Sequence, residues 1–201
     1  MILSYSQKDK IMLLKGKKIL ITGVANDWSM AWAIAQRAHE NGAEIAMPYG
    51  HPNVEKRVRP LAEKIGAKFV QECNVQNDEQ MDALFDAIEH EWGHLDGVLH
   101  AIAFSDRNEL TGRYADTTRD NFKNTMDISV YSLVDLTRRA SKLMTNGGSV
   151  VALTYYGGKS PFQITMLWVS QNLRWKVRCV IWHLTWGAIK FVLMRFRLAR
   201  F

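Results

Sequence analysis

A loop with a single glycine follows the first apolar run of the chain. Residues 17–23 read KKILITG, and the sequence reaches Ser29-Met30-Ala31 after a further loop. Gly23 permits a tight turn, and the N–H groups of Ser29 and Met30 would open the next helix, where they can hold an anion such as a pyrophosphate. The loop lacks the G-x-G-x-x-G pattern. On these residues alone, a plain strand–loop–helix turn with a capping serine is an equal alternative.

Three further side chains have chemically useful types. Tyr155 ends a predicted strand in the run Leu153-Thr154-Tyr155-Tyr156-Gly157, where a tyrosine can donate a proton. Taken singly, a half-exposed strand-end tyrosine is the commoner role. We expect His100 to pack at a strand end and Cys73 to lie in the core, because no base beside Cys73 would activate a thiolate.

Five strands and four helices are needed to position these residues. Short apolar runs that end in glycine or polar residues alternate with segments of helical periodicity. This alternation predicts an α/β protein with a doubly wound parallel sheet, in which ligands bind beyond the carboxyl ends of the strands. The predicted strands span residues 17–23, 42–47, 68–73, 97–101 and 148–153, and the predicted helices span 29–41, 54–65, 78–92 and 122–144.

Composition narrows the class of protein. The chain has 201 residues, of which 47% are hydrophobic, and two cysteines. This is enough chain for one domain and too few cysteines for a disulfide framework or a zinc cluster, so we expect a reducing compartment and no metal. We find no signal-peptide pattern and no apolar run long enough to span a bilayer, which favours a soluble, cytoplasmic protein.

The net charge of +6 is unevenly distributed. Residues 1–157 carry 18 Lys/Arg and 20 Asp/Glu, whereas residues 158–201 carry 8 Lys/Arg and no acidic residue. The last 44 residues also hold four of the seven tryptophans. Because the main body is slightly acidic, it gives no electrostatic argument for nucleic-acid binding.

Several motifs in order along the chain resemble one known family. Together with the loop at 23–31, they are similar to the NADH-dependent enoyl-acyl-carrier-protein reductases of bacterial type II fatty-acid synthesis, a branch of the short-chain dehydrogenase/reductases. The resemblance covers nearly all of residues 12–157 and implies a Rossmann-like fold. The motifs are Cys73-Asn74-Val75, His100-Ala101-Ile102-Ala103-Phe104, Gly112-Arg113-Tyr114, Met126-Asp127-Ile128-Ser129-Val130-Tyr131-Ser132 and Leu153-Thr154-Tyr155-Tyr156-Gly157.

The resemblance implies an enzyme that reduces trans-2-enoyl-acyl-carrier-protein with NADH during fatty-acid elongation. A hydride passes from the nicotinamide to the β-carbon of the enoyl thioester, and a tyrosine and a lysine assist at the carbonyl oxygen and the ribose. The family is usually homotetrameric. The motif Met47-Pro48-Tyr49-Gly50 holds no basic residue that would pair with a 2′-phosphate, which favours NADH over NADPH.

The resemblance also implies a set of cofactor contacts. Gly23, Ser29 and Met30 correspond to the pyrophosphate and ribose contacts, and Asn74 and Val75 to the adenine contacts. The family usually has Asp-Val at the latter place, but an asparagine can still accept from the adenine amino group, without a charge. We expect Gly23→Val to abolish NADH binding while leaving the fold intact.

Three more residues follow from the same resemblance. Ile102 corresponds to the backbone beside the nicotinamide ribose, and Ser105 to the backbone that touches the enoyl substrate. Tyr155 corresponds to the first of two active-site tyrosines. At Gly50 the family often has a glutamine near the adenosine ribose, so that contact is not carried over.

The resemblance stops after Gly157. Residues 158–201 contain no tyrosine, so the second active-site tyrosine is absent, and no lysine stands at the family spacing. Codons can be chosen for Phe162 to Val169 that, read two bases later, give PNYNVMG, and the same offset from Phe191 to Phe201 allows IRVNAISAGPI. Both fit the family. We therefore interpret residues 158–201 as a basic, Trp-rich, frameshifted tail. On this interpretation the C-terminal part of the domain is missing or out of frame. We expect the tail to form helix or coil that packs apart from the sheet.

Three alternatives remain open. Trp168, Trp175 and Trp182 lie seven residues apart with basic residues between them, which is typical of an amphipathic segment on an anionic membrane. The chain would then be a binding module. The other two are an NADH-binding protein that carries out no reduction and a short-chain dehydrogenase of other specificity.

Overall fold

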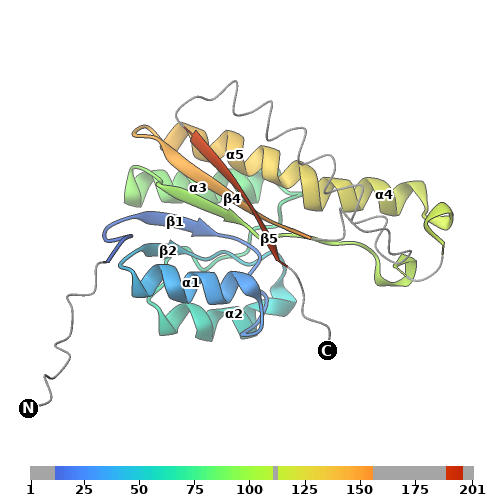
Figure 1. The fold of residues 1–201 in the computed structure, drawn as a ribbon, viewed down its shortest axis with the longest axis horizontal. Coiled ribbons are helices and arrows are strands. Elements are labelled where there is room, and N and C mark those ends of the chain that lie inside the picture. The colour runs from blue at the N-terminus through green and yellow to red at the C-terminus, as the bar shows by residue number, and fades with distance from the viewer. Residues whose placement is uncertain (1–11, 111–112, 156–188, 197–201) are drawn as a thin grey trace, which may run out of the picture.

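The computed structural model describes residues 12–110, 113–155 and 189–196. Its sheet has the strand order β2-β1-β3-β4-β5, and every neighbouring pair is parallel. This confirms the predicted α/β class with a Rossmann-like parallel sheet (Figure 1). The strands are β1 (Lys18–Ile21), β2 (Glu44–Ala46), β3 (Gly97–His100), β4 (Gly148–Tyr155) and β5 (Ile189–Phe196).

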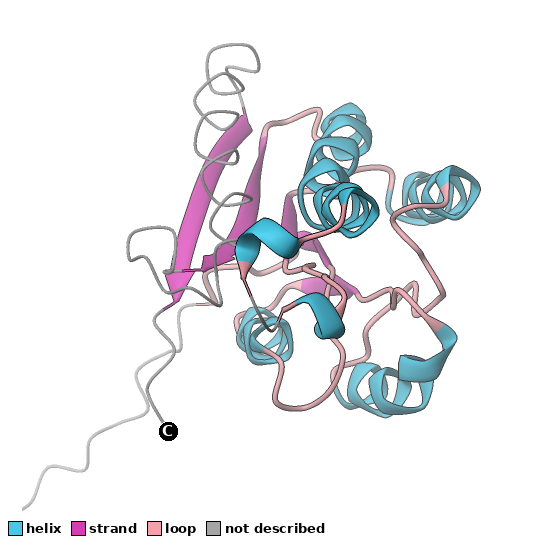
Figure 2. Ribbon diagram, turned by 90° about the vertical axis from the view of Figure 1, so that its right-hand side faces the viewer, coloured by secondary structure: helices cyan, strands magenta, loops and turns pink. Residues whose placement is uncertain are grey.

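Helices cover both faces of this sheet. Figure 1 shows α1 (Met30–Glu40) and α2 (Pro52–Lys64) on one side, and α3 (Asp78–Trp92) and α5 (Ser132–Leu143) on the other. The connection from β1 to β2 and the connection from β3 to β4 run in opposite directions across the sheet. Since such crossovers are right-handed, their helices lie on opposite faces. Figure 2 shows several of these helices nearly end-on beside the strands.

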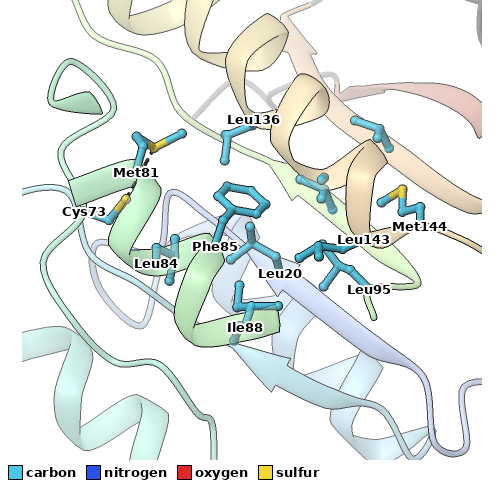
Figure 3. Close-up of a cluster of buried hydrophobic side chains, with 14 of the residues drawn as sticks. Leu20, Cys73, Met81, Leu84, Phe85, Ile88, Leu95, Leu136, Leu143 and Met144 are labelled. Carbon is cyan, nitrogen blue, oxygen red and sulfur yellow. Dashed lines mark hydrogen bonds between the residues drawn. The ribbon is translucent and has the colours of Figure 1, made fainter. Parts of the chain in front are cut away.

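Side chains alternate between the two faces of each strand and so form two cores. Leu20 of β1 and Val98 of β3 pack with α3 and α5, whereas the next residues, Ile21 and Leu99, pack with α1 and α2. The period of two is that of a strand buried on both faces. Figure 3 shows the α3–α5 core around Phe85. This core includes Leu20, Cys73, Met81, Leu84, Phe85, Ile88, Leu95, Leu136, Leu143 and Met144.

The predicted strand at 68–73 is wrong. The segment makes only two isolated parallel bridges with the chain around β2, at Ala46–Lys68 and Tyr49–Glu72. Phe69 explains the interruption, because its φ of 51° is left-handed and breaks an extended run. Its ring packs edge-on against Trp92, with ring centroids 5.0 Å apart.

The predicted helix at 122–144 is also interrupted. The structure has α4 (Arg119–Met126), a π-helical turn η3 (Asp127–Tyr131) and then α5. The side chain of Thr118 accepts from the N–H of Asn121 and caps the start of α4. Two short 3₁₀ turns precede α4, η1 (Arg107–Glu109) and η2 (Tyr114–Asp116).

The described residues form five strands, but one of them lies in the tail. The expectation that the tail stays apart from the sheet is wrong for residues 189–196, because β5 pairs with β4 from Gly148–Ile189 to Tyr155–Phe196. The run IKFVLMRF is rich in strand-forming apolar residues. Its pairing with β4 provides hydrogen-bond partners for the backbone N–H and C=O groups along that edge of β4. The tryptophans of the proposed amphipathic segment lie outside the described residues.

We predict that the α3–α5 core carries much of the stability of the fold. Leu136 is 1% exposed in that core, so Leu136→Ala should lower the free energy of unfolding by about 2–5 kcal/mol through lost burial and a cavity. Leu13 is 78% exposed, and Leu13→Ala should change it by less than about 0.5 kcal/mol. Urea unfolding followed by circular dichroism checks both, and equal effects would contradict this packing.

Candidate functional site

The loops after β1 and β3 touch at the carboxyl edge of the sheet. Thr22 donates to the carbonyl oxygen of Leu99 from both its N–H (3.0 Å) and its hydroxyl (2.9 Å). Gly23 follows with φ +85°, and a Cβ there would lie 2.1 Å from the carbonyl oxygen of Ala101. The glycine is therefore required by a backbone contact between the two loops, and no side chain obstructs the edge at this point.

This contact corrects one expectation about Gly23. A substitution there destabilises the fold, because a Cβ would meet the backbone of Ala101. Gly23 is thus a structural requirement of the edge, whatever it also contacts in a complex.

The chain enters α1 through a turn held by Asn26. The N–H of Trp28 donates to the Asn26 Oδ1 (3.0 Å), and the Ser29 hydroxyl donates to the Asn26 carbonyl oxygen (2.6 Å). Ser29 has the extended backbone of an N-cap residue but makes no side-chain cap bond. The prediction that Ser29 occupies the N-cap position is therefore confirmed, but the prediction that its hydroxyl caps the helix by a hydrogen bond is wrong. Met30 begins the helix.

The start of α1 suits a negatively charged group. Its first turn contains no acidic residue, and the first N–H groups of a helix have no partner within the helix. Trp28 is 90% exposed and Met30 is 42% exposed at this point. A ligand can reach the helix terminus without displacing packed side chains.

Asn74 and Val75 follow the bridge at Glu72 and precede α3. The N–H of Asn74 donates to the Gln80 Oε1 (2.7 Å), and its Oδ1 accepts from the N–H of Gln76 (3.1 Å). These bonds fix the asparagine and leave its oxygen a second lone pair. Val75 is partly buried and packs against the α3–α5 core, as Ile102 does.

Ser105 lies in a buried polar cluster next to the loop after β3. It is 8% exposed, and its hydroxyl accepts from the Thr125 Oγ1 (3.0 Å). Asn121 also contacts it and accepts from the N–H of Asp106 (3.1 Å). The Ser105 side chain is thus committed to structure, which leaves its backbone as the part that a substrate can meet.

The backbone places Tyr155 at the same edge. His100, the last residue of β3, pairs with Ala152, so β4 extends three residues beyond β3 and ends at Tyr155. The structure brings Gly23, Ile102 and Tyr155 to the carboxyl ends of three neighbouring strands. Asn74 and Val75 lie beyond the β2 side of the sheet, next to the segment that bridges to Tyr49.

His100 and Cys73 are buried, as expected. His100 is fully buried, and its Nε2 lies 2.7 Å from the Ser132 hydroxyl. Burial lowers the pKa of His100 from the ordinary 6.5 to about 3, so the ring is neutral. Burial likewise raises the pKa of the Cys73 thiol to about 12, and its sulfur lies 3.4 Å from that of Met81. Neither side chain is poised for acid–base or nucleophilic chemistry.

The polar residues on the buried side of α4, η3 and α5 were not predicted as part of the site. Asn121, Thr125, Ser129 and Ser132 are all at most 7% exposed. Their sequence spacing of four, four and three residues is the signal that would have revealed them, because it places polar side chains on one helical face. Within the described residues, no cluster of three or more His, Cys, Asp or Glu could hold a metal, and no helix is long and apolar enough to cross a membrane.

The parallel sheet and the loops at its carboxyl edge define a Rossmann-like α/β protein. Comparison with known proteins specifies its family. The family model described as Enoyl-(Acyl carrier protein) reductase matches residues 23–168. The match extends beyond Gly157 to Trp168. The chain belongs to the enoyl-(acyl carrier protein) reductase family.

Curated relatives and solved structures agree with this assignment. The chain is 53% identical over 147 residues to the enoyl-(acyl-carrier-protein) reductase (NADH) FabI of Rickettsia bellii, a match that covers 73% of this chain and 56% of the relative. It is 52% identical over 147 residues to the enoyl-(acyl-carrier-protein) reductase (NADH) 1 of Rhizobium meliloti, covering 73% of this chain and 54% of that protein. The chain therefore spans about half the length of these curated relatives.

The structural match extends further along the chain than the match to the curated sequences. The enoyl-(acyl-carrier-protein) reductase of Anaplasma phagocytophilum, solved in complex with NAD, superposes with a TM-score of 0.89 at 40% identity, covering 94% of this chain and 73% of that one. The enoyl-(acyl-carrier-protein) reductase (NADH) of Aquifex aeolicus gives 0.86 at 37% identity, with 94% and 76% coverage.

We predict that Gly23 tolerates no side chain. Gly23→Ala should cost about 1–2 kcal/mol of folding free energy for its positive φ and about 1–3 kcal/mol more for the collision with Ala101. Gly66→Ala is the matched control, because Gly66 has φ +58° and nothing within 4 Å of its Cβ position. Chemical unfolding of both variants measures the difference, and equal costs would refute the close contact.

A second prediction concerns pH. Because the folded-state pKa of His100 lies below its ordinary value, the unfolded chain binds the proton first, and stability falls as the pH drops from about 6.5 toward 3. His100→Gln should make this fall shallower by up to about 1.4 kcal/mol per pH unit. Urea unfolding at a series of pH values measures the slope. A parent slope in His100→Gln would contradict the account.

Proposed function

We propose that residues 12–157 form the NADH-binding part of an enoyl-acyl-carrier-protein reductase of fatty-acid elongation. The observation that carries the proposal is the contact of Gly23 with Ala101, which brings the start of α1 beside the loop after β3. Membership of the family and the relatives named as NADH reductases support it.

The residues present fit a dinucleotide. Its pyrophosphate needs N–H donors and close backbone approach, which Gly23 and the first turn of α1 offer. The adenine needs an acceptor and an apolar wall, which the Asn74 side chain and the partly buried Val75 offer. Residues 47–50, which follow β2, include no basic residue that would pair with a 2′-phosphate, which supports NADH over a 2′-phosphorylated cofactor.

In the proposed reaction, bound NADH supplies the hydride that reduces the enoyl double bond. Ser29 and Met30 orient the pyrophosphate and ribose, and the backbone at Ile102 lies against the nicotinamide ribose. The backbone at Ser105 contacts the enoyl thioester of the acyl-carrier-protein substrate. Tyr155 is the first of the two active-site tyrosines. Assembly as a homotetramer in the cytoplasm completes the proposal, on the strength of the family resemblance.

We further propose that residues from about 158 onward are an out-of-frame translation of the same gene. The agreement of the shifted codons with the family supports this proposal. The pairing of β5 with β4 counts against it, although the shifted codons also give a strand-forming run, IRVNAI, from Phe191 onward. One DNA sequence read across the Gly157 codon decides the question: an intact frame with the printed tail would overturn the proposal.

The function is tested by binding and turnover measured separately. The chain as printed should bind NADH but reduce crotonyl thioester at least about 10²–10⁴-fold more slowly than an intact relative, because a positioned proton donor is missing. The chain restored to the proposed frame after Gly157 should recover NADH-dependent reduction, measured as loss of absorbance by NADH.

Two outcomes would contradict the proposal. Reduction at an ordinary enzyme rate by the printed chain would overturn the out-of-frame tail and the assignment of the missing residues. If neither chain binds NADH, the assignment of NADH as the cofactor is overturned. Alcohol oxidation by the restored chain, without enoyl reduction, would favour the dehydrogenase alternative, and selective sedimentation of the printed chain with anionic liposomes would favour the membrane-binding alternative.

A further inference from the structure

A row of buried polar side chains on α4, η3 and α5 faces the loop after β3. Its members are Asn121, Thr125, Ser129 and Ser132, which we call the polar row. Ser129 lies in the π-helical turn η3. Such turns are rare, and they are frequent at functional sites.

Ser129 binds both polar groups of one loop residue. Its hydroxyl accepts from the N–H of Phe104 (3.0 Å) and donates to the carbonyl oxygen of Phe104 (3.1 Å). One side chain therefore satisfies the donor and the acceptor of the residue that stands between Ile102 and Ser105. Ser129 is 2% exposed, so water cannot replace these bonds without rearrangement.

The rest of the polar row fixes the ends of the same loop. The Ser132 hydroxyl donates to the carbonyl oxygen of Ile128 (2.6 Å), so its contact with His100 Nε2 (2.7 Å) has the histidine as donor. At the far end, Thr125 donates to the Ser105 hydroxyl (3.0 Å). With both ends held, the orientation of the middle of the loop depends on Ser129.

We propose that Ser129 is a positioning residue for the nicotinamide half of the cofactor site. This rests on the proposed function, which places the backbone of Ile102 at the nicotinamide ribose. Phe104 keeps 47% of its side chain exposed at the edge, so the neighbouring peptides are set by the backbone bonds to Ser129 and not by burial of the ring. Among the described residues, the hydrogen bonds of Ser129 go to Phe104 and not to Gly23 or Asn74. The segment at Asn74 meets the same helical region through Gln76, which donates to Asp127 and not to Ser129, so we expect the adenosine half to be less sensitive to Ser129.

The test separates the two halves of the cofactor by titrating the full chain with NADH and with ADP, which lacks both the nicotinamide and its ribose. Ser129→Ala should weaken NADH binding about tenfold, the effect of losing a buried hydrogen-bonded anchor, and leave ADP binding within about twofold of the parent. Ser141→Ala is the matched control, because the Ser141 hydroxyl bonds only back to the Arg138 carbonyl oxygen among the contacts found (2.8 Å). It should bind both ligands like the parent.

Amide hydrogen exchange at Phe104 gives a second measurement that needs no ligand. The amide should be protected in the parent and in Ser141→Ala and should exchange faster in Ser129→Ala, while amides of β3 keep their protection. Should Ser129→Ala fail to fold, Ser129→Cys, which retains the side-chain volume, takes its place in both measurements.

The outcomes distinguish this inference from the proposed function. Equal weakening of NADH and ADP binding, unchanged NADH binding, or unchanged exchange at Phe104 would each overturn the positioning role while leaving the cofactor site in place. A parent chain that binds neither ligand would overturn the proposed function and, with it, the role of Ser129.

Discussion

The backbone contact between Gly23 and Ala101 is the constraint on which the rest of the edge depends. It brings two loops from neighbouring parallel strands within van der Waals distance, and only a residue without a Cβ allows it. Because α1 begins a few residues later, the same contact sets where the N–H groups of the helix terminus lie. The turn after β1 is thus made with one glycine, where the G-x-G-x-x-G motif of other Rossmann-like folds has three.

The two cores hold this edge in register from both faces of the sheet. Strands β1 to β4 contribute alternate residues to the α1–α2 side and to the α3–α5 side, so a slip of one residue would move each side chain from one core to the other along the whole strand. The polar row adds a second kind of restraint, in which buried hydroxyl and amide groups hold the loop after β3 by hydrogen bonds. Packing positions the strands, and hydrogen bonds position the loop.

Much of the fold followed from the sequence, and the exceptions have local causes. Periodicity predicted α1, α3 and the parallel β1, β3 and β4, because both cores impose regular spacing on them. The prediction of a strand at 68–73 was wrong because Phe69 has a left-handed backbone conformation, with its ring packed edge-on against Trp92, and periodicity does not reveal such a residue. For the candidate site, motif resemblance pointed to Gly23 and Ile102, which the structure places at one edge of the sheet, whereas Ser129 was not singled out because its hydrogen bonds go to a segment distant in sequence. β5 was not predicted because the interpretation of the tail rested on its lack of family motifs, whereas its strand-forming residues indicate a strand.

The central claim is that three loops of one sheet edge bind a single dinucleotide. Amide hydrogen exchange of the full chain with and without NADH tests it most directly. The account predicts that added protection appears together in residues 23–31, 74–75 and 102–105, with little change in α2. Protection confined to one of these segments, or located on the opposite edge of the sheet near Asp96 and Gly148, would contradict it.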